Sequence, residues 1–492
     1  TAYEIVSRDW SSDVCSSDLF PGGKGRELTA EDFIYSWKRL ADPKNTASGW
    51  WVLDGKIRGL NEWREQAGKK GHADYSAKIE GLSAPNPQTL VVRLIRPNPL
   101  FLNSLAILPT FVVAREAAEK YGAEFGRHAV GTGPYLLKEN SGSRLVWEKN
   151  PSYRFVPYPK EGMPGDLEAG LLEDAGQPIP RNSRIVTQIN EESLPSWLSF
   201  LAGKIDLSSI PRDSYAEALP EGNEPSLELK KKGVRVLQFS QMDLTRVSFN
   251  LHDPLFAKNR KLRQALSLAF DTTPLIKTFY NGQAIPAQGP IPPGIFGHDP
   301  HLQNPFRRYN PERARALLAE AGYPGGQGLP PIDFVAVAGG NSRQITEYIE
   351  RQFKPLGVRL KVESFSWPEY TKRVMSKRGQ MWSFGWIPFF PDGENFLQLF
   401  YGKNEAPGPN DMNYKNPLFD SLFEKARSEM NEKKRLELYR RMVGIVIEDV
   451  PCIFSAHRID HLLAHPWLKN VKPHNFAPDQ AKYYRVEGRP SP

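Results

Sequence analysis

The sequence predicts an α/β protein of two or three lobes. Its 492 residues exceed what one hydrophobic core normally organises. A strand, a helix and a return to extended chain follow one another between residues 184 and 209, and the pattern changes at residues 249–251 before helices and strands alternate again. Such alternation is typical of helices packed on sheets. We therefore expect α/β lobes on both sides of residue 250.

The first half contains one strongly patterned helix and several shorter elements. Thr29 is a favourable N-cap, and apolar residues recur at helical spacing from Phe33 until Asp42-Pro43 ends the pattern. Turn residues and alternation then predict a turn and a strand at 83–94, strands at 144–148 and 184–189, and a helix that ends at Gly203.

The second half repeats the alternation with longer helices. Asn310-Pro311 begins one of them, with an N-cap followed by proline at the first helical position, and Gly322 ends it. Periodicity predicts further helices at 259–271, 343–356 and across 417–450, with a strand at 359–365.

Composition limits the class of protein. The chain is 40% hydrophobic and 24% charged, and no window holds 18 uninterrupted apolar residues, so we predict no membrane-spanning helix. The formal charge of +8 is spread along the chain, and its densest run, 230–232, precedes a glycine in a predicted turn. Without a stripe of interleaved basic and aromatic residues, we expect no nucleic-acid partner.

The first nineteen residues, TAYEIVSRDWSSDVCSSDL, have no initiating Met, no apolar stretch and no periodicity. They resemble a translated sequencing-adapter read, so we expect residues 1–19 to be an artefactual tail. On that interpretation Cys15 is not a natural residue, and a disulfide between Cys15 and Cys452 is not expected. The missing signal peptide then carries no information about localisation.

The most informative segment is 380–400, QMWSFGWIPFFPDGENFLQLF, in which seven of 21 residues are aromatic, against 11% in the whole chain. Glycine and proline interrupt it, and its two charged residues, Asp392 and Glu394, follow the densest part. Rings on an irregular segment with few polar groups predict the wall of an apolar ligand pocket. A core strand that continues into a loop explains the same pattern, with the rings filling the interior, and both interpretations stay open.

Three histidines, His457, His461 and His465, recur at four-residue intervals. On a helix they would share one face, and His457 to His461 would resemble the HxxEH arrangement of zinc peptidases, with Asp460 in place of the glutamate. Residues 450–454 instead predict the entry of a strand. In extended chain, imidazoles four residues apart lie about 13 Å from one another, beyond the reach of one metal ion. We expect no metal and no cofactor, and keep a zinc hydrolase that uses His457 and His461 as an alternative.

Other catalytic motifs are weak. Residues 131–135, GTGPY, lack the third glycine and the following helix of a dinucleotide-binding loop, so they predict a tight turn before a strand. Neither a GxSxG nucleophile motif nor a phosphate-binding P-loop is present in the sequence. This pattern favours binding over catalysis.

Six segments resemble, in order, the family 5 extracellular solute-binding proteins, which are the oligopeptide and dipeptide receptors of ABC importers. The resemblance extends from Arg26 to about Val486. The matching segments are LTAEDFIYSWKRLADPKNTAS from Leu28, VGTGPYLLKEN from Val130, LSFLAGKIDLSSIP from Leu198, FAKNRKLRQALSLAFD from Phe256, YNPERARALLAEAGYPGG from Tyr309 and GWIPFFPDGENFLQLF from Gly385.

This resemblance implies a bilobal, periplasmic-binding-protein-like α/β fold of the class II type, whose lobes close over a ligand. Two crossing strands would join the lobes. It implies an extra subdomain over residues 20–130, a first lobe over 131–250 to which 466–492 return, and a second lobe over 251–465.

One departure from the family pattern is informative. In peptide-binding members the residue three after the Trp of the GW motif is an Asp that pairs with the ligand's α-amino group, and here it is Phe389. Some members carry an Arg three residues before that Trp, facing the ligand's carboxylate, and here Ser383 occupies the position. Burying a charged terminus without a partner costs several kcal/mol. We expect a ligand with a capped, weakly charged or aromatic part, unless Asp392 replaces the missing carboxylate.

We therefore predict a substrate-binding receptor of an ABC importer, not an enzyme. We expect it to be a periplasmic monomer that captures a peptide-like or other small organic ligand and delivers it to a permease. A non-peptide ligand such as haem or a nickel complex stays open as an alternative. The predicted ligand-binding residues are Trp386, Phe389, Phe390, Asp392, Thr132 and Tyr135, the last two near the hinge.

Overall fold

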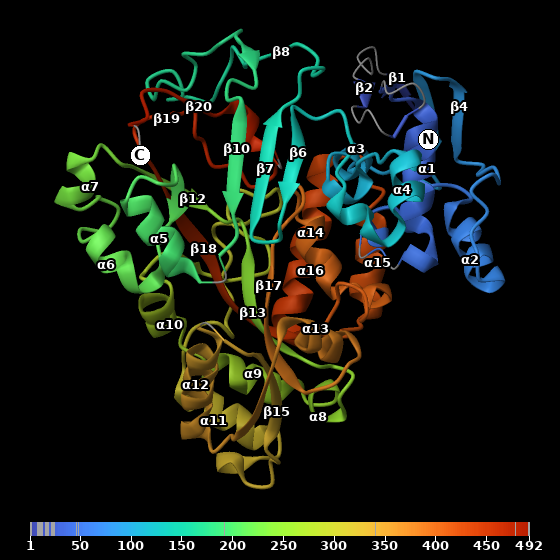
Figure 1. The fold of residues 1–492 in the computed structure, drawn as a ribbon. Helices are drawn as coiled ribbons and strands as arrows, with labels where there is room; N and C mark the ends of the chain where they lie inside the picture. Colours follow the sequence, from blue (N-terminus) through green and yellow to red (C-terminus); the bar gives the residue numbers. More distant parts are fainter. Residues whose placement is uncertain are drawn as a thin grey trace. The chain divides into compact units, whose positions relative to one another are not determined.

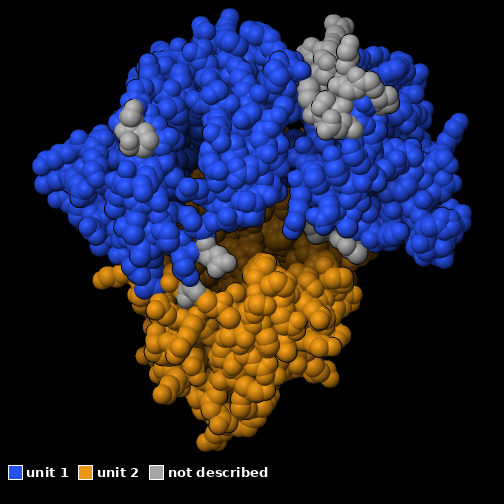
Figure 2. All heavy atoms as spheres, in the orientation of Figure 1, with its two compact units in different colours: residues 1–237, 462–492 blue, residues 238–461 orange. Residues whose placement is uncertain are grey.

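The computed structural model describes residues 2–6, 13–14, 19–20, 25–45, 47, 49–190, 192–339, 341–477 and 479–490. The chain divides into two compact units (Figure 2). Unit 1 comprises residues 1–237 and 462–492, and unit 2 comprises residues 238–461. The predicted division of the first part into an extra subdomain over 20–130 and a lobe over 131–250 stays a prediction. Cys15 lies outside the described residues.

The first helix of unit 1 is capped as the sequence predicts. The α1 helix (Ala30–Ala41) starts where the sequence predicts, and the Asp32 carboxylate accepts a hydrogen bond from the Thr29 backbone N–H at 2.8 Å. Trp37 is buried, and its indole N–H donates to the Thr110 carbonyl at 3.2 Å. The remaining helices of unit 1 are α2 (Leu60–Lys70), α3 (Phe101–Leu105), α4 (Arg115–Tyr121), α5 (Ser193–Leu201), α6 (Tyr215–Ala218) and α7 (Leu227–Lys231).

Two three-stranded antiparallel sheets belong to unit 1. One has the order β1 (Ala2–Val6), β5 (Thr89–Arg93), β4 (Leu82–Asn86), and the other the order β10 (Arg184–Gln188), β7 (Arg144–Lys149), β6 (Tyr135–Asn140). The strands predicted at 144–148 and 184–189 are confirmed. Residues 83–86 were predicted as a turn but form strand β4, because hairpin pairing with β5 supplies a partner and an edge strand tolerates Pro85.

Short strands complete unit 1. Residues 1–19 carry no periodicity, yet 2–6 pair with β5. The shorter strands are β2 (Asp13–Val14), β3 (Arg26–Glu27), β8 (Val156–Pro157), β9 (Pro178–Ile179), β11 (Leu207–Ser209), β19 (Leu468–Lys469) and β20 (Arg485–Val486).

Unit 2 is built on a mixed sheet. Its strands follow the order β18 (Cys452–Ala464), β13 (Leu244–Phe249), β17 (Met381–Trp386), β15 (Ile332–Val337), β16 (Leu360–Phe365), and β14 (Ala284–Pro286) also pairs with β18. The β17 strand runs antiparallel to β13 and parallel to β15, so it occupies the middle of the sheet.

Helices cover the sheet of unit 2 (Figure 1). The predicted helices are confirmed as α9 (Arg260–Leu268), α11 (Pro311–Glu320), α12 (Ser342–Phe353), α15 (Pro417–Ala426) and α16 (Glu432–Asp449), alongside α8 (Pro254–Ala257), α10 (Thr272–Phe279), α13 (Trp367–Met375) and α14 (Glu394–Leu397). One core cluster joins α9, α11 and α12 to the sheet face that carries Val247, Phe249 and Met381. In the described part of the chain, no helix has the length and hydrophobicity that a membrane span requires.

Two strands carry the chain between the units. The boundary at 237/238 falls within β12 (Arg235–Ser240), and the boundary at 461/462 falls within β18. Both strands pair with each other. The first boundary, at 237/238, precedes β13, whereas the sequence pattern changes at residues 249–251, where β13 ends. The two connecting strands that the resemblance implies are present, and only their exact positions could not be read from composition.

Candidate functional site

The aromatic segment begins as the central strand of unit 2. Antiparallel register pairs Leu244 with Trp386, Arg246 with Phe384 and Ser248 with Trp382. Residues directly opposite one another share a face of the sheet, so the three rings of β17 lie on one face. Trp382 is fully buried, and its indole N–H donates to the Asp411 carboxylate at 2.7 Å. The inner part of the aromatic run therefore fills the interior.

The outer part of the run is accessible. Trp386 is half-buried and meets Phe389 in an edge-to-face contact, with ring centroids 6.1 Å apart and planes at 76°. Phe389 is 38% exposed, and the neighbouring Ile387 is 54% exposed. Trp386 Nε1 has no hydrogen-bond partner among the described residues. Trp386 and Phe389 thus offer an apolar surface, while the indole nitrogen of Trp386 is itself buried.

A third ring extends this surface and was missed by the sequence prediction. Trp367 opens α13 and is 57% exposed. It stacks on Phe384 with centroids 6.0 Å apart and on Tyr370 at 5.6 Å, with planes at 23° in both pairs. The Tyr370 hydroxyl donates to the Ser383 carbonyl at 2.5 Å, which ties α13 to β17. The Ser-Trp-Pro sequence after a strand marks a helix start but does not show which ring Trp367 meets.

Asp392 occupies a buried position. Its carboxylate accepts hydrogen bonds from the Tyr439 hydroxyl at 2.6 Å, the Glu394 backbone N–H at 2.9 Å and the Arg435 guanidinium at 3.1 Å. Burial raises the pKa of Asp392 to about 6, against the pull of these donors. The carboxylate proposed from sequence as a ligand's counter-charge is therefore already bound within unit 2.

Phe390 is buried and belongs to the support of the loop. The Asn395 side chain, also buried, accepts from the Phe389 backbone N–H and donates to the Phe390 carbonyl, both at 3.2 Å. These two bonds hold the backbone of the exposed ring and of the buried ring in one arrangement. Phe390 therefore contributes its backbone and packing where the sequence suggested a wall residue.

The two remaining predicted residues belong to unit 1. Thr132 is half-buried and precedes β6. Tyr135 is the first residue of β6, and its hydroxyl donates to the Asn182 carbonyl at 3.3 Å. Burial, assisted by the charge of Asp479, raises the pKa of Tyr135 to about 12. Their assignment to ligand binding stays a prediction.

The three histidines are placed on an extended chain. His457 and His461 lie in strand β18, and His465 follows its last residue. The His457 ring Nδ1–H donates to the Asp243 carbonyl at 2.6 Å, and burial lowers the pKa of His457 to about 4. His465 is stacked on Trp467, with centroids 4.1 Å apart. Among the described residues, no cluster of three potential metal ligands is found.

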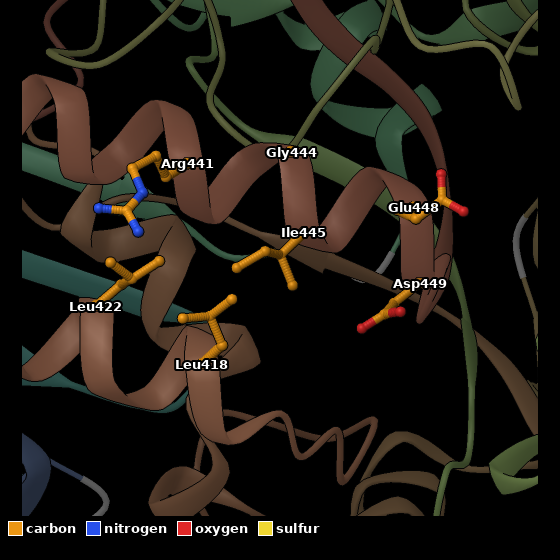
Figure 3. A pocket seen from close by; sticks show the side chains of 7 residues that line it. All are labelled: Leu418, Leu422, Arg441, Gly444, Ile445, Glu448 and Asp449. Atoms are coloured by element: carbon orange, nitrogen blue, oxygen red, sulfur yellow. The ribbon is translucent and has the colours of Figure 1, made fainter.

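Two cavities lie in unit 2, apart from the aromatic loop. One, of about 480 Å³, is a seam between α15 and α16, where Leu418, Leu422 and Ile445 point toward one another and acidic side chains lie at the far end (Figure 3). The other, of about 220 Å³, is bordered by Ile291, Gly297 and α16. No ring of the aromatic segment lines either cavity, so neither contributes to the candidate site described above.

Two α/β units joined by two strands, with accessible aromatic rings where a central strand ends, form the architecture that the comparisons with known proteins identify. A family model, bacterial extracellular solute-binding proteins, family 5, matches residues 23–408, and the chain belongs to this family. The resemblance recognised in the sequence is confirmed. The family consists of binding proteins, and the chain is a substrate-binding receptor of the ABC-importer type.

Curated relatives cover most of the chain. Heme-binding protein A of Haemophilus influenzae is 25% identical over 94% of this chain and 78% of that protein. The oligopeptide-binding protein OppA of Bacillus subtilis is 27% identical over 87% of this chain and 73% of that protein. The dipeptide-binding protein of Escherichia coli is 25% identical over 91% of this chain and 76% of that protein.

A solved structure confirms the fold. The periplasmic binding protein DppA from Helicobacter pylori, in complex with the peptide STSA, has a TM-score of 0.76 and 21% identity. The match covers 99% of this chain and 86% of that one. The bilobal α/β fold class predicted from the sequence is therefore confirmed.

Proposed function

We propose that this receptor captures a peptide-like or other small organic ligand whose part next to Phe389 carries no free amino group. The observation that carries the proposal is that an aromatic ring occupies position 389: Phe389 is accessible, while Asp392, the nearest acidic residue in the sequence, is buried and bound by three donors. An ammonium group placed against Phe389 would find no carboxylate from this loop.

Energetics favour the uncharged partner. An ammonium that loses water without gaining a counter-charge costs several kcal/mol. An apolar or aromatic group against Trp386 and Phe389 instead gains about 1.5 to 3 kcal/mol from burial.

Capture would work by a shift in population. An open form holds water between the units, ligand contacts to both units favour the closed form, and a permease recognises the closed form. Trp386, Phe389 and Trp367 would form the apolar wall, and Thr132 with Tyr135 would contribute from unit 1. We place the protein in the periplasm as a monomer without a nucleic-acid partner or catalytic activity.

The relatives support a broad ligand range. Their names state haem, oligopeptides and dipeptides as ligands of those proteins. A haem-like ligand is favoured by one observation here, the 57% exposure of the Trp367 ring, which stacks on Phe384. The zinc hydrolase alternative is disfavoured, because His457 and His461 are four residues apart on a strand.

A matched pair of peptides tests the proposal. We expect the wild type to bind N-acetyl-Ala-Phe-Ala at least about ten-fold more tightly than Ala-Phe-Ala in calorimetry, since a tenfold ratio corresponds to about 1.4 kcal/mol. Phe389→Asp should reverse this preference by supplying a carboxylate. Phe111→Asp, at a similarly exposed ring of unit 1, should leave it unchanged.

Two results would contradict the proposal. One is equal or tighter binding of the free amine by the wild type. The other is native mass spectrometry that finds a retained compound with a free α-amino group whose affinity falls in Phe389→Asp. A retained porphyrin would support the planar-ligand alternative in place of peptides.

A further inference from the structure

We infer that Asp392, Tyr439 and Arg435 are positioning residues that anchor the aromatic loop, residues 386–393, to helix α16. The anchor itself is a property of unit 2, and its effect on affinity rests on the proposed function. None of the three side chains needs to touch the ligand. They would act by keeping Trp386 and Phe389 in the arrangement that a ligand meets.

The contacts join segments far apart in the sequence. Tyr439 and Arg435 lie one turn apart on α16, and both donate to the same carboxylate, at 2.6 and 3.1 Å. The exposed fractions of Asp392, Tyr439 and Arg435 are 4%, 0% and 5%. Such charge-assisted bonds, shielded from water, are stronger than neutral ones.

Phe296 also binds the backbone of the aromatic loop. The Phe296 backbone N–H donates to the Pro391 carbonyl at 3.2 Å, and the Gly393 N–H donates to the Phe296 carbonyl at 2.8 Å. The Phe296 ring lies over the Arg435 guanidinium at 4.8 Å and meets Tyr439 edge-to-face at 6.0 Å. Phe296 therefore touches both the loop backbone and the two donors on α16.

The packing around Gly393 and Gly297 is tight. A Cβ added at Gly393 would lie 2.9 Å from both Ile291 Cδ1 and the Phe296 carbonyl oxygen, and one at Gly297 would lie 2.8 Å from Tyr439 Cδ2. A side chain at either position would force these neighbours to shift. The loop can thus approach α16 closely enough for Asp392 to reach its donors.

Loss of the anchor should weaken the affinity for the ligand. Phe389, which is exposed, and Trp386, which is half-buried at the end of β17, lie three and six residues before Asp392. The Asn395 side chain bonds to the backbone of Phe389 and Phe390, and the rest of the loop is rich in proline and glycine. A loop that samples several arrangements must be ordered by the ligand, and that ordering weakens affinity. The effect should appear mainly as faster dissociation.

The test compares two tyrosines that make bonds of equal length. The Tyr439 hydroxyl donates to Asp392 and the Tyr414 hydroxyl donates to Asp449, both at 2.6 Å, and both tyrosines are buried in unit 2. We expect Tyr439→Phe to accelerate hydrogen–deuterium exchange of the backbone amides of 386–393 in the ligand-free protein. Tyr414→Phe should lower the melting temperature comparably and leave exchange in this loop unchanged.

Binding supplies the second readout. N-acetyl-Ala-Phe-Ala should bind Tyr439→Phe about ten-fold more weakly than wild type, mostly through dissociation, with no such loss in Tyr414→Phe. Asp392→Asn should produce the same loop exchange, and the double variant Asp392→Asn with Tyr439→Phe should add little further.

The outcomes separate the two proposals. Unchanged loop exchange in both Tyr439→Phe and Asp392→Asn would overturn the anchor, whatever the peptides do. Faster exchange with no binding of the acetylated peptide by wild type would support the anchor and refute the proposed ligand class. Equal effects of Tyr439→Phe and Tyr414→Phe on the loop would show general destabilisation and would also overturn the anchor.

Discussion

Two buried titratable residues of unit 2, Asp392 and His457, have pKa values displaced by burial in opposite directions. Burial raises the pKa of Asp392 from 3.8 to about 6 and lowers that of His457 from 6.5 to about 4. Both shifts favour the uncharged form. For Asp392, the contribution to stability declines as pH rises from about 4 to about 6, whereas for His457 it declines as pH falls from about 6.5 to about 4.

The histidine gives a prediction at the scale of one residue. Between pH 7 and pH 4, the depressed pKa of His457 should lower the free energy of unfolding of the wild type by about 3 kcal/mol, because one pKa unit is worth about 1.4 kcal/mol. His457→Gln should not show this decrease. Urea unfolding at several pH values measures this as a flatter profile for the variant. His72→Gln, at an exposed histidine of unit 1, is the control. Parallel profiles for wild type and His457→Gln would contradict the prediction.

At the scale of elements, the aromatic loop depends on how closely backbone segments approach. Gly393 precedes α14, and any residue can adopt its backbone angles. A larger residue is disfavoured there because its Cβ would lie too close to Ile291 and Phe296. Gly444, inside α16, has open space around its Cα. Gly393 and Gly444 therefore serve different purposes.

Alanine at each position separates these purposes. Gly393→Ala should destabilise the protein by about 1 to 3 kcal/mol, as overpacking does in a filled interior. Gly444→Ala should stabilise it by about 0.5 to 1 kcal/mol, because alanine is the better helix former. Chemical denaturation measures both. Equal effects of the two substitutions would show that the packing around Gly393 relaxes without cost.

At the scale of the whole molecule, β12 and β18 are the two strands on which the chain passes between the units. A receptor connected in this way can close by rotating one unit against the other, since few residues have to change conformation. A permease would recognise the closed form, so closure, and not ligand contact with one unit alone, would signal that a ligand is bound.

Small-angle scattering can detect this closure. We expect saturating N-acetyl-Ala-Phe-Ala to reduce the radius of gyration of the wild type, because a ligand that contacts both units favours the compact form. The same peptide concentration should leave Phe389→Asp unchanged. Binding shown by calorimetry without any contraction would contradict closure by this ligand.

Local signals in the sequence predicted the helices well. Helices α1, α9 and α11 depend on caps and apolar spacing within a dozen residues, and the predicted helices match them closely. Strand β4 was missed because its proline and asparagine are typical of turns, and only pairing with β5 makes it a strand.

For the candidate site too, some features follow from the sequence and others only from the tertiary structure. The sequence by itself determined the family, the aromatic segment and the presence of Phe389 where a carboxylate would pair with an amine. Only the tertiary structure decided that Asp392 is bound to Tyr439, 47 residues further on, and that Trp367 stacks on Phe384. Composition and spacing reveal the chemistry of a side chain, but its partners depend on sheet order and helix packing, which bring distant residues together.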